Sequence, residues 1–149
     1  MDPETPNYTE KEYPLDRLVD DPKFYAEIPA PPRKGEYEPT TRKTHIWEEG
    51  HQEEFKAIGF NSFEQTLPSL IKIATNKNSL QAIDPHSGNT ISVDPSEGIV
   101  VVTRETPFDY SNPPFKIPNQ PPLPPIVVTA FVLEDPRNAK HYIKNITRR

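Results

Sequence analysis

The sequence has no cysteine, only five glycines and one tryptophan, and no long apolar run. Without cysteine neither a disulfide framework nor a thiolate metal site can form, so stability must come from packing. No stretch approaches the roughly 20 apolar residues of a membrane-spanning helix, and the first residues lack the basic start and apolar run of an export signal. The single, scattered glycines exclude a phosphate-binding glycine loop. We therefore expect a protein with a small core and no membrane anchor.

Proline, in contrast, is abundant, with 20 among 149 residues. Each proline fixes one backbone dihedral angle and removes one hydrogen-bond donor. Eight of them lie in residues 1–42, which also carry many charges and no apolar period. We expect residues 1–43 to form an extended, acidic, Pro-rich arm or linker, anchored locally by aromatic residues such as Phe24. Residues 44–149 are expected to form a small domain that folds without this arm.

Two amphipathic helices are expected at the start of that domain. The first covers residues 44–58, where four residues recur at the spacing of one helical face: Trp47, His51, Phe55 and Ile58. The second begins after the capping-box pattern Ser62-Phe-Glu-Gln65 and continues to Asn76.

The period then shortens to that of β-strands. "LQAID", "NTISVD" and "GIVVVTRE" are rich in β-branched residues and are separated by the turn clusters DPHSG and DPSEG, and "IVVTAFVLE" at 126–134 supplies a fourth strand. The predicted fold class is α+β, with two N-terminal helices packed on one face of a four-stranded antiparallel meander sheet.

The basic segment RNAKHYIKNITRR at the end is expected to be a solvated tail, with contact to a polyanion as the alternative. PPLPP at 121–125 is interpreted as a stiff spacer in preference to a ligand of an SH3-type domain.

His45 and His51 are the first candidates for catalysis. Six residues apart, they would point roughly 240° away from each other on a regular helix, so they share a cleft only if Gly50 breaks the helix. The alternative is that His51 packs with Trp47 and that His45 is exposed. Zinc is disfavoured, because this spacing is not that of a helical zinc pair and further ligands would have to come from distant segments. No metal and no cofactor are therefore expected.

Two polar residues interrupt apolar strands, Arg104 in "VVVTRETP" and Thr129 in "IVVTAF". Both have structural explanations, since an arginine can extend along a sheet edge and threonine is a normal strand former. Together with a helix histidine, however, they provide a base, a positive charge and a hydrogen-bond donor that could act on a phosphodiester.

The order of these elements resembles the barnase/EndoU/colicin/RelE-like fold of ribonuclease toxin domains from bacterial polymorphic and contact-dependent systems. The similarity covers about residues 44–134 and is carried by "HIWEEGHQEEFKAIGFNSFEQ" and by the pair "GIVVVTRETP" and "IVVTAF". It implies metal-independent cleavage of RNA, with tRNA among the expected targets, by His51 or His45, Arg104 and Thr129. It also implies a cognate immunity protein, and delivery within a larger bacterial toxin that acts in the cytoplasm of a target cell.

The rival hypothesis is a non-enzymatic protein-interaction module that uses the Pro-rich arm and the loop at 107–125. The enzyme hypothesis predicts that the histidines and Arg104 converge within about 8 Å around a concave surface, whereas the interaction-module hypothesis predicts that they are dispersed. Of the two histidines, His51 is favoured as the base, because the packed side of its helix is expected to face the sheet.

Overall fold

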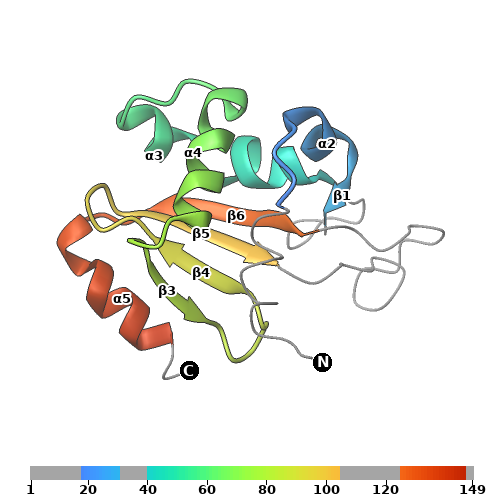
Figure 1. Cartoon of the computed structure of the whole chain (residues 1–149). Coiled ribbons are helices and arrows are strands. Elements are labelled where there is room, and N and C mark those ends of the chain that lie inside the picture. Colours follow the sequence, from blue (N-terminus) through green and yellow to red (C-terminus); the bar gives the residue numbers. More distant parts are fainter. Residues whose placement is uncertain (1–17, 31–39, 105–124, 147–149) are drawn as a thin grey trace, which may run out of the picture.

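The computed structural model describes residues 18–30, 40–104 and 125–146. They form a four-stranded sheet with helices on both sides, and a separate two-stranded ladder (Figure 1). The helices are α2 (Pro22–Glu27), the π-helix η1 (Thr44–His51), α3 (Gln52–Ala57), α4 (Phe63–Thr75), the 3-10 helix η2 (Pro136–Asn138) and α5 (Ala139–Ile146). The strands are β1 (Pro29–Ala30), β2 (Thr40–Thr41), β3 (Leu80–Ile83), β4 (Thr90–Val93), β5 (Ile99–Arg104) and β6 (Ile126–Val132).

The main sheet is an antiparallel meander in the order β3-β4-β5-β6, which confirms the predicted α+β class and the four expected strands. Strands β1 and β2 form a separate two-residue ladder. The PPLPP run, apart from Pro125, lies outside the described residues, as do 1–17 and 31–39 of the expected arm.

Helix α4 starts where the capping pattern predicts. The Ser62 hydroxyl oxygen accepts a hydrogen bond from the Gln65 N–H at 3.1 Å, and the Gln65 side chain in turn accepts the N–H of Asn61 at 2.9 Å. Pro68 lies within the helix on its exposed side. The opposite side places Leu67, Leu70 and other apolar residues in the core.

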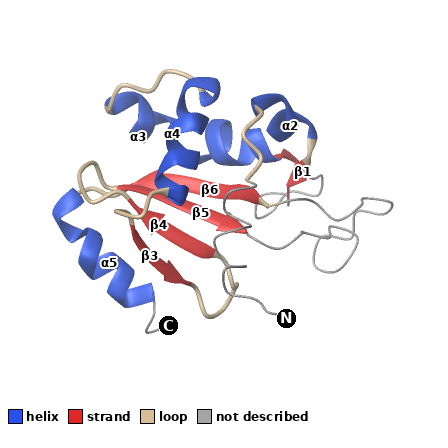
Figure 2. Cartoon of the chain, viewed as in Figure 1, coloured by secondary structure: helices blue, strands red, loops and turns tan. Residues whose placement is uncertain are grey.

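The two expected N-terminal helices pack on one face of the sheet as predicted, and a further helix covers the other face (Figure 2). Helices α2, η1 and α4 pack on the first face, and α5 packs on the second, where Ala139 and Ile146 are buried and Tyr142 and Ile143 contact the sheet. The expectation of a solvated tail is therefore wrong for residues 139–146. These four residues have the spacing of one helical face, so burial of apolar surface outweighs the solvation of the intervening lysines, which remain exposed.

Part of the expected arm belongs to the core. Tyr25 of α2 is fully buried, and its ring lies edge-on to Phe63 of α4 with ring centroids 5.8 Å apart. The Tyr25 hydroxyl donates to the Val19 carbonyl oxygen at 2.7 Å and accepts the Val127 N–H at 2.9 Å, and burial raises the pKa of this phenol. The boundary drawn at residue 43 therefore does not separate residues 18–30 from the domain.

The outer edge of β6 is covered by hydrogen bonds from the N-terminal half of the chain. The Val102–Thr129 and Thr103–Val127 pairs leave Val128 as an extra residue in a β-bulge, and the buried Arg42 guanidinium donates to the Val128 carbonyl oxygen at 3.0 Å. Further bonds join Val19 N–H to the Pro125 carbonyl oxygen, Val127 N–H to Tyr25, and Val132 N–H to Glu54. These bonds satisfy edge groups that would otherwise be open to pairing with another strand.

Two turns of the meander have the same design. In both, an aspartate side chain accepts the N–H two residues ahead, and a glycine with positive φ donates to the carbonyl oxygen of that aspartate at 2.8 Å. The glycines are Gly88, with φ 76°, and Gly98, with φ 75°.

Alanine at these glycines is expected to destabilise the protein unequally. Gly88→Ala should lower the free energy of unfolding by about 1–2 kcal/mol, the cost of a left-handed backbone for a residue with a Cβ atom. Gly98→Ala should cost more, because its Cβ would lie 3.2 Å from the Cα of Pro136, whereas a Cβ at Gly88 meets nothing within 4 Å. Urea unfolding of both variants measures the difference, and equal costs would argue against this close approach.

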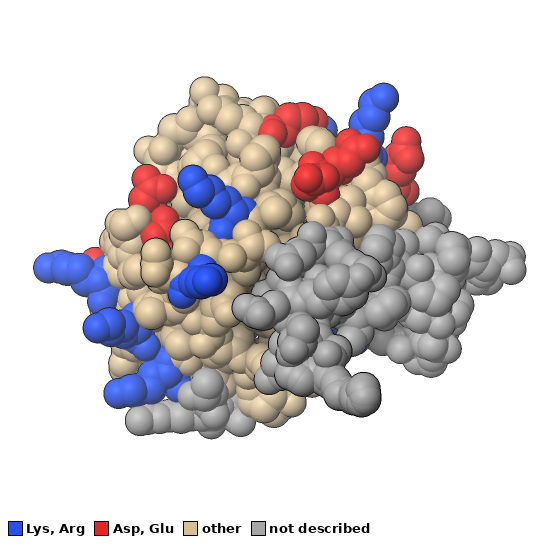
Figure 3. All heavy atoms as spheres, viewed as in Figure 1, with Lys and Arg blue, Asp and Glu red and all other residues tan. Residues whose placement is uncertain are grey.

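Charges divide over the surface shown in Figure 3. Lysine and arginine side chains gather over α5, whereas aspartate and glutamate gather over α2. The α2 segment contributes Asp20, Asp21 and Glu27, and the sequence of α5, AKHYIKNI, contains no acidic residue.

Candidate active site

The first candidate histidine lies where the N-terminal helix changes its geometry. The segment expected to be one helix is a π-helix, η1, followed by α3, and His51 is the last residue of η1 with φ −118° and ψ 30°. The break falls one residue after Gly50, the position at which the sequence permits one. Short π-helical segments are frequent at functional sites, because they redirect side chains relative to a regular helix.

His51 is held by a carboxylate that also binds the sheet. The His51 Nδ1 atom lies 2.6 Å from Glu54 Oε2, and Glu54 Oε1 accepts the Val132 N–H at 2.9 Å. A hydrogen bond from Nδ1 to an ionised carboxylate places a hydrogen on Nδ1, and in a neutral imidazole this leaves the Nε2 lone pair to accept a proton. Both side chains are 42% exposed, so the pair is accessible from solvent.

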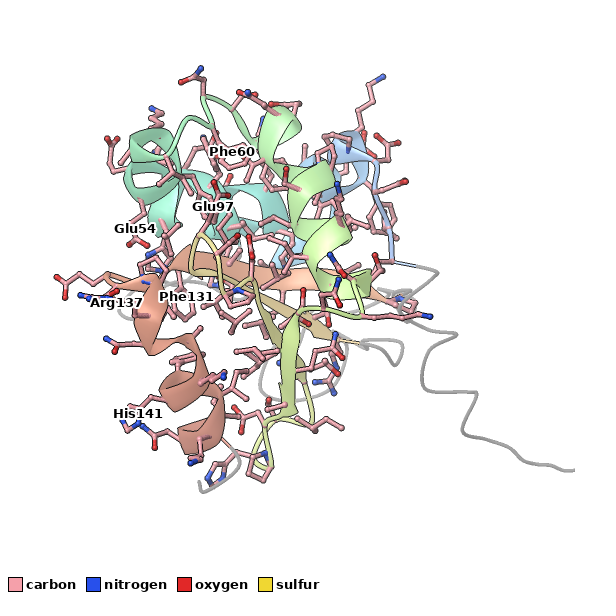
Figure 4. The ribbon with its side chains drawn as sticks, turned by 60° about the vertical axis from the view of Figure 1, so that its left-hand side comes forward. Glu54, Phe60, Glu97, Phe131, Arg137 and His141 are labelled. Atoms are coloured by element: carbon pink, nitrogen blue, oxygen red, sulfur yellow. The ribbon has the colours of Figure 1, made fainter. Side chains whose placement is uncertain are left out.

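The His51 ring also contacts the end of β6. Its centroid lies 5.6 Å from that of Phe131, and Phe131 packs edge-on against Tyr142 of α5 at 5.9 Å. Glu54, Phe131 and Arg137 lie at the same end of the sheet in Figure 4. His51 therefore lies beside the β6 residue that also packs on α5. Trp47 and Phe55 stack on each other, with ring centroids 6.0 Å apart.

His45 lies earlier in η1 and is half-buried, not exposed. Burial lowers its pKa, and the positive charge of nearby Arg42 lowers it further. Both effects favour the neutral imidazole. Since Arg42 donates to the carbonyl oxygen of Val128, this buried cation joins the residues just before η1 to the middle of β6.

Thr129 follows that carbonyl group in β6. It pairs with Val102, while Phe131 pairs with Val100, so Thr129 and Phe131 point to the same face of the sheet. Their Cα atoms are about 7 Å apart along the strand, at roughly 3.3 Å per residue. The fold therefore places Thr129 on the same stretch of β6 that His51 contacts, two residues from the contact.

Arg104 lies elsewhere. Its guanidinium Nη1 donates to Asn89 Oδ1 at 3.1 Å and approaches the Ser87 carbonyl oxygen at 3.4 Å, both in the turn between β3 and β4. In the sheet it pairs with Ile126, five residues from Phe131, which corresponds to about 17 Å along β6. The convergence of Arg104 with His51 within about 8 Å is therefore not found, because the two residues belong to opposite ends of the β5–β6 ladder.

Two residues of this region were not predicted from the sequence. Glu54 had a visible signal, because it follows His51 by three residues and such residues are neighbours on a helix surface. Arg42 had none, because its partner in β6 is 86 residues away in the sequence.

Within residues 18–30, 40–104 and 125–146, no three His, Cys, Asp or Glu side chains are grouped so that they could hold a metal ion. No helix in the same ranges is long and apolar enough to span a bilayer.

Comparison with models of protein families, with curated proteins and with solved structures finds no significant match to this chain.

Proposed function

We propose that this chain is a metal-independent endoribonuclease whose base is His51. The observation that carries the proposal is the partly exposed His51–Glu54 pair. The His51 ring lies beside Phe131, which is on the same strand as Thr129. A carboxylate bound to Nδ1 orients the ring and stabilises the imidazolium that forms when Nε2 accepts a proton. The link from Glu54 to the backbone of β6 fixes the pair against a rigid element.

The proposed reaction is an internal transesterification. His51 Nε2 removes the proton of a ribose 2′-hydroxyl, and the 2′-oxygen attacks the adjacent phosphorus. The bond from phosphorus to the 5′-oxygen breaks, which leaves a 2′,3′-cyclic phosphate on one fragment and, once the leaving oxygen takes up a proton, a 5′-hydroxyl on the other. The Thr129 hydroxyl would donate a hydrogen bond to the phosphate as its charge develops.

The wider setting follows from the resemblance to toxin ribonucleases and is part of the same proposal. It comprises tRNA as a target class, a cognate immunity protein that covers the site, and action in the cytoplasm of a target cell after delivery within a larger toxin. Arg104 is not included in the reacting group, because it is bound to the β3–β4 turn.

Incubation of the purified chain with total cellular RNA and tRNA tests the activity. We expect cleavage that persists in a chelator and yields 2′,3′-cyclic phosphate ends. DNA of matching sequence should stay intact, because it lacks the attacking hydroxyl group. A chain that is freed of any bound partner and still leaves both RNA pools intact would sink the proposal.

One observation favours a second candidate, the protein-interaction module. That hypothesis predicts dispersed candidate residues, and Arg104 is indeed separated from His51. It requires that no RNA is cleaved and that replacement of His51 changes stability alone, so the same assay distinguishes the two functions.

A further inference from the structure

Helix α5 combines an apolar face that is covered by the sheet with a basic face that is exposed to solvent. Ala139 and Ile146 are buried against the sheet, whereas Lys140, His141 and Lys144 are exposed. In Figure 3 positively charged side chains gather over this helix. Basic side chains are therefore concentrated on this exposed face, on a chain whose net charge is −5.

A cavity of about 330 Å³ lies beside the same helix. Its lining combines amides, two ring side chains, two carboxylates and one leucine: Asn138, Asn145, His141, Tyr142, Glu134, Asp135 and Leu133. This volume is at the lower end for small-molecule pockets and suits a single planar group. At about 100° per residue, the cavity side of α5 and its lysine side are roughly 120° apart around the helix axis.

The cavity connects to the candidate active site through ring contacts. Tyr142 lines the cavity and packs against Phe131, and Phe131 contacts His51. In Figure 4 His141 lies on the outer side of α5, and Phe131 lies near the start of that helix. A polymer lying along α5 would thus reach His51 without crossing the sheet.

We infer that α5 and the cavity beside it form a binding track, a continuous surface that binds single-stranded RNA. This inference rests on the proposed ribonuclease function. Lys140 and Lys144 contact phosphates, and an unstacked base enters the cavity beside His141. Single-strand binding proteins combine these two features, a cationic path for the backbone and ring side chains for the bases. The cavity carboxylates repel phosphates. Asp135 already accepts hydrogen bonds from Arg137, so Glu134 is the carboxylate that accepts them from base amino groups. The two sides of the helix thus receive different parts of the polymer.

The burial pattern of α5 argues against an anionic membrane as the partner. An interfacial helix inserts its apolar face into the lipid, but that face of α5 is packed on β3 and β4. The cavity argues against duplex RNA, because bases that are paired and stacked cannot be inserted into it.

The test measures binding of the full chain to a single-stranded 2′-O-methyl RNA of roughly 12 nucleotides, a length within single-strand site sizes. This probe cannot be cleaved through a 2′-hydroxyl, so binding is measured independently of catalysis. The double variant Lys140→Ala/Lys144→Ala is compared with Lys23→Ala/Lys56→Ala, which removes the same charge from exposed positions on α2 and α3.

We expect the Lys140→Ala/Lys144→Ala variant to bind the probe about tenfold or more weakly than the wild type at low salt. The slope of log affinity against log salt concentration should fall by about 1.4, which is about 0.7 for each lost phosphate contact. The α2/α3 pair should bind like the wild type. His141→Ala should weaken binding roughly fivefold or more, with a smaller change in slope, because it removes a stacking surface.

The inference is wrong if the wild-type chain does not bind the probe, if both double variants lose the same affinity, or if a duplex binds as tightly as the single strand. It is also wrong if the chain binds phosphatidylserine vesicles through these lysines but does not bind the probe. If RNA is cleaved at a rate independent of Lys140 and Lys144, the ribonuclease function stands and the track alone fails. If the probe binds as expected but RNA is never cleaved, the ribonuclease function fails while the binding surface remains.

Discussion

A chain that begins at residue 31 is expected to lose the cooperative thermal unfolding transition of the full-length protein. The deletion removes Leu18, Tyr25 and Ile28 from the core and uncovers part of the β6 edge. The free energy of unfolding of such a domain is only about 5–15 kcal/mol, and loss of several buried side chains lowers it by a comparable amount. A shortened chain that still melts cooperatively would restore the expectation from sequence that this segment is a linker.

Point variants of Tyr25 separate packing from hydrogen bonding. Tyr25→Ala should cost about 3–5 kcal/mol, as for other large buried aromatic residues. Tyr25→Phe should cost about 1–3 kcal/mol, because the ring remains but the buried Val127 N–H loses its acceptor. The exposed neighbour provides the control, since Lys23→Ala should change stability by less than about 0.5 kcal/mol. Urea denaturation measures all three, and a Tyr25→Phe variant as stable as wild type would exclude a role for the hydroxyl.

His51→Ala is expected to lower the single-turnover rate constant for RNA cleavage by about 10² to 10⁴, the usual contribution of acid–base catalysis. The melting temperature should change little, because the side chain is 42% exposed. Glu54→Gln should give an intermediate rate, because the amide oxygen still accepts the Val132 N–H but no longer stabilises an imidazolium.

Two further variants act as controls for that assignment. Arg104→Ala should retain cleavage, because Arg104 is bound to the β3–β4 turn. His45→Ala tests the other histidine. If His45→Ala alone abolishes cleavage while His51→Ala only destabilises the protein, the roles of the two histidines must be exchanged.

The sequence predicted those parts of the fold that local chemistry determines. The Ser62 cap fixed the start of α4, and the turn clusters with their glycines separated the strands of the meander. Helix α5 could also be predicted from local sequence, since its four inward-facing residues have helical spacing. Its lysines, however, suggested a solvated tail. In this segment the helical spacing of the apolar residues, and not the charge of the lysines, determines the structure.

The remaining features depend on contacts that no local pattern encodes. Tyr25 meets Val127 across 102 residues, and Arg42 meets Val128 at a bulge that only the pairing of β5 with β6 creates. The separation of Arg104 from His51 has a similar origin, because it depends on which end of β6 each residue faces. Polar residues in apolar strands could be recognised from sequence, but their relative positions could not.

The covered edge of β6 also determines when the protein can finish folding during synthesis. Tyr25 is translated 102 residues before Val127, its hydrogen-bonding partner at the start of β6. Contacts so distant in sequence slow folding, and the early segment stays without its partners meanwhile. A translation product that stops before residue 126 therefore exposes Tyr25 and its apolar neighbours to chaperones and proteases, whereas a completed chain buries them.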